Sequence, residues 1–309
     1  MLPRRFIQFP TIDGMQVSNA NAVGTIRVRP GQRLTKLVLK YVDGQASPTT
    51  DMVGANSLTP VIGDITCFKN GSDFRLHSAT ELDYLNSQNN TPGTTEYSYQ
   101  NVGSGATKAQ YLTIYFFEPW RATPADREAG ALIIDKSQGW NDDGLEVQIK
   151  LLAALPSTAS LTATGYVDSF VPNTNAAQAV KVVKRLNITA SGTVVDYLSL
   201  PAIGGLQGIN LKNPATSGTI SSIIFKAANR TWVDDIPTYD AIAHLTSMNL
   251  TAPSSSAGAG AFAYSVVFDD TDPVQAALQV DGANPWLRIK SSSAMSGNIV
   301  AVVEAIQAI

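Results

Sequence analysis

Two histidines are the side chains of this sequence best suited to proton transfer at neutral pH, and their surroundings in the sequence offer them little chemistry. His77 and His244 each lie at or in a short predicted helix. No constellation of cysteine, histidine or carboxylate groups accompanies either one at the spacing that metal ligands require. We therefore interpret both histidines as structural or surface residues.

The other patterns that could carry chemistry are also weak. The glycines of Gly204–Gly208 lack the strand-turn-helix context of a nucleotide-binding loop. Asn141–Gly144 and Asp269–Asp272 are acidic but lack the spacing of a calcium loop, so we interpret them as solvated turns. Cys67, alone in the sequence and inside an apolar run, is expected to be a small buried hydrophobe. We predict no catalytic, cofactor-binding or metal-binding residue, no cofactor and no enzymatic activity.

Basic residues gather at two places in the sequence. Arg4 and Arg5 stand near its start, and Lys181, Lys184 and Arg185 form the second cluster. Each cluster is either an ordinary charged face or a contact with an anionic lipid surface or an acidic neighbouring subunit. Apolar residues interleave with the first cluster, namely Phe6, Ile7, Phe9 and Ile12. This combination predicts an N-terminal arm that lies on a membrane surface or in a subunit groove.

The composition favours a globular protein whose surface carries little charge. The chain has 309 residues, of which 44% are hydrophobic and only 15% charged, against roughly 25% in an average soluble domain. The low charge indicates that neighbours cover part of the surface. A net charge of −3 argues against direct nucleic-acid binding, which needs a basic footprint. We find neither a signal-peptide pattern nor an apolar run long enough to span a bilayer, and expect synthesis in a host cytoplasm.

Strand patterns dominate the sequence. Leu145–Leu151 alternates apolar and polar residues, as a strand with one buried face requires. Turn pairs such as Asn70-Gly71 separate such runs. Helix is sparse: Ser78 and Glu81 form a capping box, and Pro237 suits the start of a second short helix. The fold class that follows is all-β with short helical inserts.

The order of these patterns occurs twice along the chain, which predicts two copies of one β-unit of about 150 residues each. The matched segments are 24–40 with 192–211, 62–69 with 220–226, 111–117 with 262–268, 129–135 with 276–281, and 145–152 with 299–306. A polar, proline-bearing linker, Val171–Ala177, separates the copies. We predict residues 1–172 as the N-terminal arm plus the first domain, and residues 173–309 as the linker plus the second.

The sequence resembles the double jelly-roll major capsid proteins of tailless icosahedral phages and viruses with an internal membrane, of the corticovirus, tectivirus and autolykivirus type. The resemblance is carried by 24–31, 65–71 with its Asn-Gly turn, 78–86 and 112–119, and by their repeat after Gly192. It implies two tandem jelly-roll β-sandwiches. It also implies a structural bacteriophage virion protein whose homotrimers form pseudo-hexagonal capsomers. These capsomers would contact their neighbours, tile the shell over the membrane, and touch that membrane or its proteins.

Two other functions fit a protein of this class. The first is a carbohydrate- or receptor-binding β-sandwich spike, which would need clustered exposed aromatic rings. The four tryptophans, however, are scattered through the sequence: Trp120, Trp140, Trp232 and Trp286. The second is a cupin-like enzyme, which would need at least two histidines and a carboxylate around one metal ion. The separation of His77 from His244 makes that function unattractive.

Overall fold

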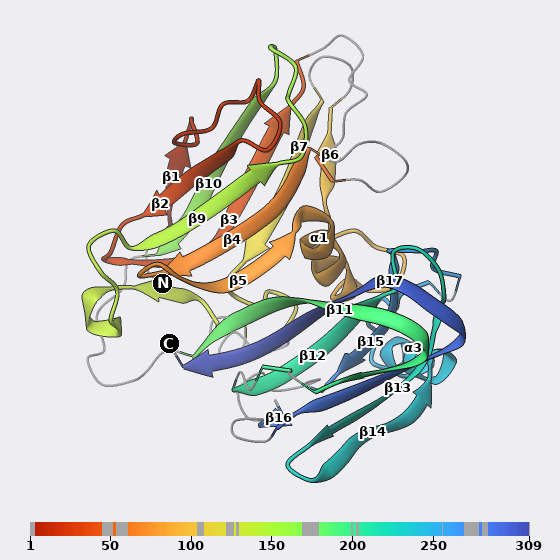
Figure 1. Ribbon diagram of the computed structural model, residues 1–309. Coiled ribbons are helices and arrows are strands. Elements are labelled where there is room, and N and C mark those ends of the chain that lie inside the picture. Colours follow the sequence, from red (N-terminus) through yellow and green to blue (C-terminus); the bar gives the residue numbers. More distant parts are fainter. Residues whose placement is uncertain are drawn as a thin grey trace. The chain divides into compact units, whose positions relative to one another are not determined.

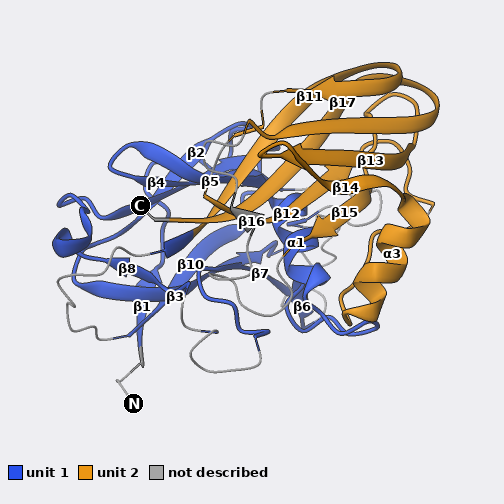
Figure 2. Ribbon diagram, turned by 90° about the horizontal axis from the view of Figure 1, so that it is seen from below, with its two compact units in different colours: residues 1–180, 308–309 blue, residues 181–307 orange. Residues whose placement is uncertain are grey.

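The computed structural model describes residues 4–44, 52–53, 61–103, 108–121, 127, 130–168, 179–198, 200–201, 204–254, 256–268, 278–279 and 284–308. The chain divides into two compact units (Figure 2). Unit 1 comprises Met1–Val180 with Ala308–Ile309, and unit 2 comprises Lys181–Gln307. The predicted linker Val171–Ala177 lies outside the described residues. Each unit is built from antiparallel strands, as Figure 1 shows.

Unit 1 contains two sheets. The first has the strand order β1-β10-β3-β7-β6, with β8 also paired to β3. Its strands are β1 (Arg4–Phe9), β10 (Ser160–Asp168), β3 (Gln32–Val42), β7 (Ala109–Tyr115), β6 (Gln100–Val102) and β8 (Leu132–Ile134). The second sheet has the order β2-β9-β4-β5. Its strands are β2 (Val23–Val28), β9 (Leu145–Leu151), β4 (Ile62–Lys69) and β5 (Ser72–Ser78).

The chain path in unit 1 is that of a jelly roll. The chain crosses repeatedly between the two sheets, with β1, β3, β7 and β10 in the first sheet and β2, β4, β5 and β9 in the second. The alternation in β9 buries every second residue from Leu145 to Leu151, as predicted from the sequence. In the first sheet, Leu37 and Leu39 of β3 are also fully buried. The core therefore lies between the sheets.

Unit 2 follows the same path, and two of its strands, β11 and β17, are much longer than those of unit 1. One of its sheets has the order β14-β13-β17-β11, while β12 pairs with β15, β16 and β17. The strands are β11 (Ala179–Tyr197), β12 (Gly205–Lys212), β13 (Ile220–Ala227), β14 (Arg230–Pro237), β15 (Phe262–Val267), β16 (Leu278–Gln279) and β17 (Trp286–Ala308). The protein is thus all-β with two tandem jelly rolls, as predicted.

The strand β17 serves both sheets of unit 2. Its first part, Trp286–Ser291, pairs with β13, and its last part, Ala301–Ile306, pairs with β12. Between these parts Gly297 has a φ of 91°, and Gly192 in the long strand β11 has a φ of 78°. A Cβ atom at Gly297 would also lie 2.9 Å from the Thr216 hydroxyl oxygen. Glycine at these two positions allows each long strand to change direction.

Two short helices occupy equivalent places in the two units. Helix α1 (Ala79–Gln88) lies between β5 and β7 in the sequence, and α3 (Thr238–Ser247) lies between β14 and β15. A 3₁₀ helix, η2 (Lys136–Gln138), follows β8. The predicted capping box of α1 is present, because Ser78 Oγ accepts from the Glu81 amide at 3.2 Å and the Glu81 carboxylate accepts from the Ser78 amide at 2.7 Å. Both predicted inserts are confirmed.

The strand pairing also corrects one of the predicted matches between the two halves. We matched 145–152 with 299–306, but β9 lies between β2 and β4, whereas Ala301–Ile306 pairs with β12. By position, the counterpart of β9 is Trp286–Ser291, which pairs with β13, and the counterpart of 299–306 is β10. The error arose because β17 joins two jelly-roll strands into one.

The predicted N-terminal arm is wrong for the residues that the structure describes. Arg4–Phe9 forms β1, which pairs with β10 along its whole length from Arg4↔Asp168 to Phe9↔Ala163. Ile12, just beyond it, is buried with a relative exposure of 5%. These residues therefore belong to the first jelly roll, and removing residues 1–12 would take away a strand of its sheet.

Candidate functional site

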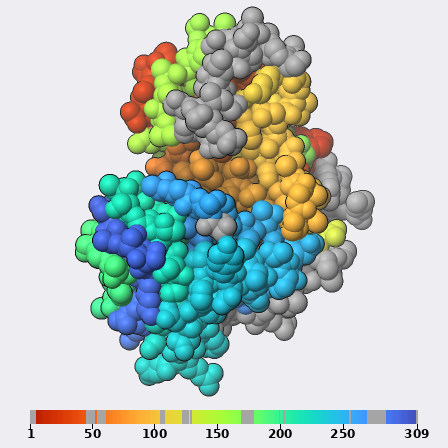
Figure 3. Space-filling view, turned by 90° about the vertical axis from the view of Figure 1, so that its right-hand side faces the viewer, coloured from red at the N-terminus to blue at the C-terminus, as the bar shows by residue number. Residues whose placement is uncertain are grey.

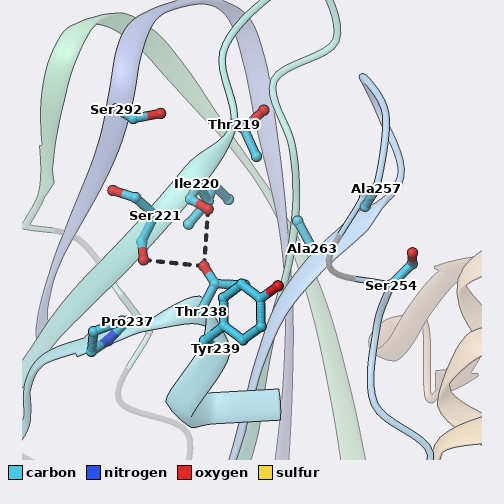
Figure 4. Close-up of a pocket in the computed structure, with 10 residues that line it drawn as sticks. All are labelled: Thr219, Ile220, Ser221, Pro237, Thr238, Tyr239, Ser254, Ala257, Ala263 and Ser292. Atoms are coloured by element: carbon cyan, nitrogen blue, oxygen red, sulfur yellow. Dashed lines mark hydrogen bonds between the residues drawn. The ribbon is translucent and has the colours of Figure 1, made fainter.

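A pocket of about 220 Å³ opens beside the first turn of α3 in unit 2 (Figure 4). Its walls come from the start of β13, the start of α3, the segment before β15 and the middle of β17. The lining residues are Thr219, Ile220, Ser221, Pro237, Thr238, Tyr239, Ser254, Ala257, Ala263 and Ser292. Hydroxyl groups dominate this lining, and it contains no histidine, cysteine, carboxylate, lysine or arginine.

The chemistry open to this pocket is hydrogen bonding. Thr238 Oγ1 lies 3.0 Å from the carbonyl oxygen of Ile220 and 3.1 Å from that of Ser221, so its proton is already shared within the wall. Tyr239 at the rim is 75% exposed. The lining supplies no base that could activate a hydroxyl as a nucleophile. Such a pocket can hold a small neutral polar molecule.

A second hollow, of about 510 Å³, lies in unit 1 beside β2, and its lining is charged. The lining residues are Phe9, Thr11, Asp13, Thr25, Arg27, Arg29, Asp142 and Asp143. Several of these charges have partners already: Arg27 pairs with Glu146 at 3.3 Å, and Asp142 pairs with Lys136. Both signs of charge occur together, so the hollow favours neither a cation nor an anion.

The two histidines lie in different units and different environments. His77 is fully buried on β5, and His244 is exposed in the last turns of α3. Among the residues that the structure describes, no group of three or more His, Cys, Asp or Glu side chains could hold a metal ion. The two histidines therefore do not share a metal site in the described part of the chain.

Cys67 is a free, fully buried cysteine on β4, as the sequence predicts. Burial raises the pKa of its thiol to about 12, although the nearby Arg75 acts in the opposite direction. A thiol with this pKa stays protonated at neutral pH, and only the thiolate is a strong nucleophile. Cys67 therefore acts as an apolar core residue.

The acidic clusters follow the predicted pattern in the one case that the structure describes. Asp142 and Asp143 are exposed in the turn that leads into β9. The Asn141 side chain accepts a hydrogen bond from the Asp143 amide at 3.1 Å, as in a solvated turn. Asp269–Asp272 lies outside the described residues.

Lys181 of the second basic cluster is not part of an open charged face. Lys181 Nζ lies 2.6 Å from Glu304 Oε2, with both side chains largely buried. The other carboxylate oxygen of Glu304 accepts from Asn210 at 3.1 Å, and Asn210 in turn accepts from Ser265 at 2.7 Å. This polar row crosses β11, β17, β12 and β15. Lys181 therefore stabilises the sheet, and it is not available to an anionic surface as the sequence suggested.

Trp120 belongs to a cluster of aromatic rings that the sequence analysis did not identify. Trp120 packs edge-on against Tyr97 and Tyr115, with ring centroids 5.5 and 5.8 Å apart. These rings contact one another, so they do not offer the flat stacking surface that sugar binding uses. Trp140 is buried, whereas Trp232 on β14 is 43% exposed. Trp120, Trp140 and Trp232 thus lie in three different environments.

The first sheet of unit 1 carries a surface that the sequence analysis did not identify. The basic–aromatic face consists of Phe6, Lys36, Lys40, Tyr111, Tyr115 and Tyr166, which lie on the side of the sheet opposite to Leu37 and Leu39. Lys36 Nζ lies 4.4 Å from the Tyr166 ring centroid, and the Phe6 and Tyr166 rings are 4.9 Å apart. Phe6 is 61% exposed. The alternation of Leu37 and Leu39 with charged neighbours was the available signal.

A second unpredicted surface lies along the outer strand of unit 2 and the helix that follows it. The acidic–apolar edge consists of Trp232, Asp234, Ile236, Tyr239 and Asp240, all of which are exposed. In the space-filling view the atoms of β14 and α3, in cyan, form a continuous surface (Figure 3). Trp232, Ile236 and Tyr239 are exposed large hydrophobic side chains that lie close together in the sequence.

Comparison with known proteins places the fold among viral coat proteins. The major capsid protein P2 from bacteriophage PM2 superposes with a TM-score of 0.68 at 14% identity, over 98% of both chains. The PBCV-1 virus capsid gives 0.61 at 11% identity, over 99% of this chain and 94% of that one. The Faustovirus major capsid protein gives 0.60 at 8%, over 99% and 90%. No protein-family model matches the sequence, and no curated protein is significantly similar to it.

These structures share the whole double jelly roll with this chain, including its two units. At such low identity the likeness establishes the fold. None of the helices in the described part of the chain is long and apolar enough to cross a membrane.

Proposed function

We propose that this protein is the major capsid protein of a tailless icosahedral bacteriophage with an internal membrane. The observation that carries the proposal is the match of the complete double jelly roll to the capsid protein P2 of bacteriophage PM2, over 98% of both chains. A single jelly-roll β-sandwich in common would be weak evidence of function, because jelly rolls serve many functions. Two in tandem, with helices inserted at the same point of each, are much more specific.

The proposed assembly is a homotrimer with a pseudo-hexagonal outline. Three copies of a chain with two similar units supply six similar units, which can pack into a nearly hexagonal tile. The low proportion of charged residues, 15%, fits a protein whose flanks are covered by neighbouring subunits and capsomers. Its location would then be the virion shell.

The proposal assigns the protein a structural role without catalysis and without direct nucleic-acid contact. The buried thiol of Cys67 and the uncharged pocket beside α3 offer no group for a reaction. A net charge of −3 suits a shell that lipid separates from the genome. Contact with the internal membrane or its proteins rests on the resemblance alone, because Arg4–Phe9 is a strand and not an arm.

The experiment that tests this proposal is a mass measurement of the purified full-length protein by light scattering at micromolar concentration. We expect a stable particle of three times the 32.8 kDa chain mass. Addition of anionic and of neutral liposomes to the same sample tests the membrane contact, since binding to the anionic vesicles alone would support it. A monomer, or a monomer that binds glycans on an array, would instead favour the carbohydrate-binding alternative.

A further inference from the structure

Each unit leaves uncovered a surface whose counterpart in the other unit is buried. In α1 the residues Ala79, Glu81, Leu82, Leu85, Asn86 and Gln88 are buried, whereas in the equivalent helix α3 only Ala241 and Leu245 are. The relation is reversed for the sheets. Every residue of β12 from Gly205 to Leu211 is buried on both faces, whereas its counterpart β3 leaves Lys40 exposed and Lys36 half-buried.

In a pseudo-sixfold ring, equivalent elements of the six units should meet similar surroundings. The helix α3 and the outer face of β3 would then need cover that their own chain does not give them. The acidic–apolar edge and the basic–aromatic face are therefore the two surfaces for which the assembly has to supply a partner.

The two uncovered surfaces are complementary. Asp234 and Asp240 give the acidic–apolar edge negative charge, and Lys36 and Lys40 give the basic–aromatic face positive charge. Both surfaces also carry large exposed rings, namely Trp232 and Tyr239 on one and Phe6 on the other. Aromatic residues at the centre and opposite charges across the contact are typical of specific protein interfaces.

We propose that the acidic–apolar edge of one copy binds the basic–aromatic face of a second copy. This inference rests on the proposed capsid function, because it names the contact that holds the trimer together. The contact joins two different patches, so it is heterologous, and repeating it around a threefold axis closes a ring. In that ring every copy uses each surface once and none remains open.

Opposite charge also decides between this partner and the other large surfaces available in a virion. The carboxylates of Asp234 and Asp240 would repel an anionic lipid leaflet or a nucleic acid. A second copy of the chain brings the lysines that those carboxylates require. Asp235 is a separate case, because it already pairs with Lys290 at 2.6 Å and accepts from Ser222 at 2.6 Å within unit 2.

The test is a set of charge reversals in the full-length protein, read by light scattering over a dilution series. The edge variant carries Asp234→Lys and Asp240→Lys, and the face variant carries Lys36→Glu and Lys40→Glu. Each should weaken the trimer about a hundredfold or more, because like charges would face each other across the contact. The variant with all four changes should recover most of the affinity. Asp142→Lys with Asp143→Lys, on an exposed turn, is the matched control and should leave the trimer intact.

The outcomes separate this inference from the proposed function. A wild-type monomer would count against the capsid function itself. A wild-type trimer that neither the edge variant nor the face variant weakens would overturn the inference and leave the capsid function standing. If a charge variant loses its cooperative thermal transition, Trp232→Ser with Tyr239→Ser replaces it, since both side chains are exposed and uncharged. That variant should also weaken the trimer, and an unchanged trimer would again overturn the inference.

Discussion

The two jelly rolls share one chain path but bury different parts of it. In unit 1 the helical insert α1 is mostly buried, and the outer face of the first sheet is open. In unit 2 the insert α3 is mostly exposed, and the strand β12 is buried on both faces. A duplicated fold has thus kept its topology while exchanging which element is core and which is surface. The comparison teaches that equivalent position in a repeat does not fix an element's environment.

Substitutions in the sheets should show the largest difference between the units in their effect on the free energy of unfolding. Lys181→Met leaves Glu304 as a buried carboxylate without its cation, so we expect the free energy of unfolding to fall by about 3 to 5 kcal/mol. The matched change in unit 1, Lys40→Met, removes an exposed charge and should alter it by less than about 0.5 kcal/mol. Denaturant unfolding monitored by circular dichroism gives both values. Equal, small losses would contradict the contrast between the two sheets.

Substitutions in the two helices should show the next largest difference in the free energy of unfolding. Leu82 of α1 is 2% exposed, and Leu82→Ala should lower the free energy of unfolding by about 3 kcal/mol through lost burial and a residual cavity. Ile242 of α3 is only half-buried, and Ile242→Ala should cost less than about 1 kcal/mol under the same conditions. If both substitutions destabilise the protein alike, α3 is part of the core after all.

The helix starts offer a smaller, opposite pair of changes. Ser78→Ala removes the capping box of α1 and should destabilise the protein by about 1 kcal/mol. Helix α3 starts at Pro237 without a side-chain cap, so Pro237→Ser should stabilise it by about 0.5 kcal/mol. Midpoints of thermal unfolding would show the two shifts in opposite directions. If both variants have a lower midpoint of thermal unfolding, Pro237 contributes more to the stability of the strand β14 than to that of the helix.

The smallest effect concerns the pH dependence of α1. Burial raises the pKa of Asp83, although a hydrogen bond from the Tyr99 amide at 2.6 Å acts in the opposite direction. The folded state therefore holds this proton more tightly than the unfolded chain does. Its contribution to stability is present below the unfolded pKa and is lost as the pH rises through the folded pKa. Asp83→Asn keeps an acceptor for Tyr99 and should gain stability over the wild type as the pH rises from about 3 to about 7.

Thermal midpoints of the wild type and of Asp83→Asn, measured across that range, test this expectation. Asp142→Asn, on an exposed turn of the same unit, is the control. A difference between Asp83→Asn and the wild type that stays constant with pH would show that Asp83 does not contribute.

Features set by neighbouring residues could be predicted from the sequence, and features set by distant contacts could not. The alternation in Leu145–Leu151 and the capping box of Ser78 and Glu81 are local, and both are confirmed. The strand Arg4–Phe9 was taken for an arm because it forms only by pairing with β10, far along the chain. Local composition, two arginines after a proline, indicated the opposite.

The candidate surfaces follow the same division. The sequence shows Lys181 as one of a basic cluster, and only the fold reveals that Glu304 neutralises it. The basic–aromatic face needs four strands in register, from Phe6 through Tyr166 and Lys36 to Tyr115, before its residues become neighbours. A sequence pattern identifies which residues of one strand point outward, but it does not say which strands lie side by side.

The long strand β17 also determines when unit 2 can form as the chain emerges from the ribosome. Neither β12 nor β13 can complete its pairing before β17 is synthesised, because the end of β17 pairs with β12 and its start pairs with β13. In unit 1 the corresponding strands β9 and β10 arrive separately. A chain interrupted before Trp286 would leave β12 and β13 each with an open edge, which is a site for aggregation. Only a chain made through β17 can present a finished second unit, so incomplete products are excluded from any assembly that needs it.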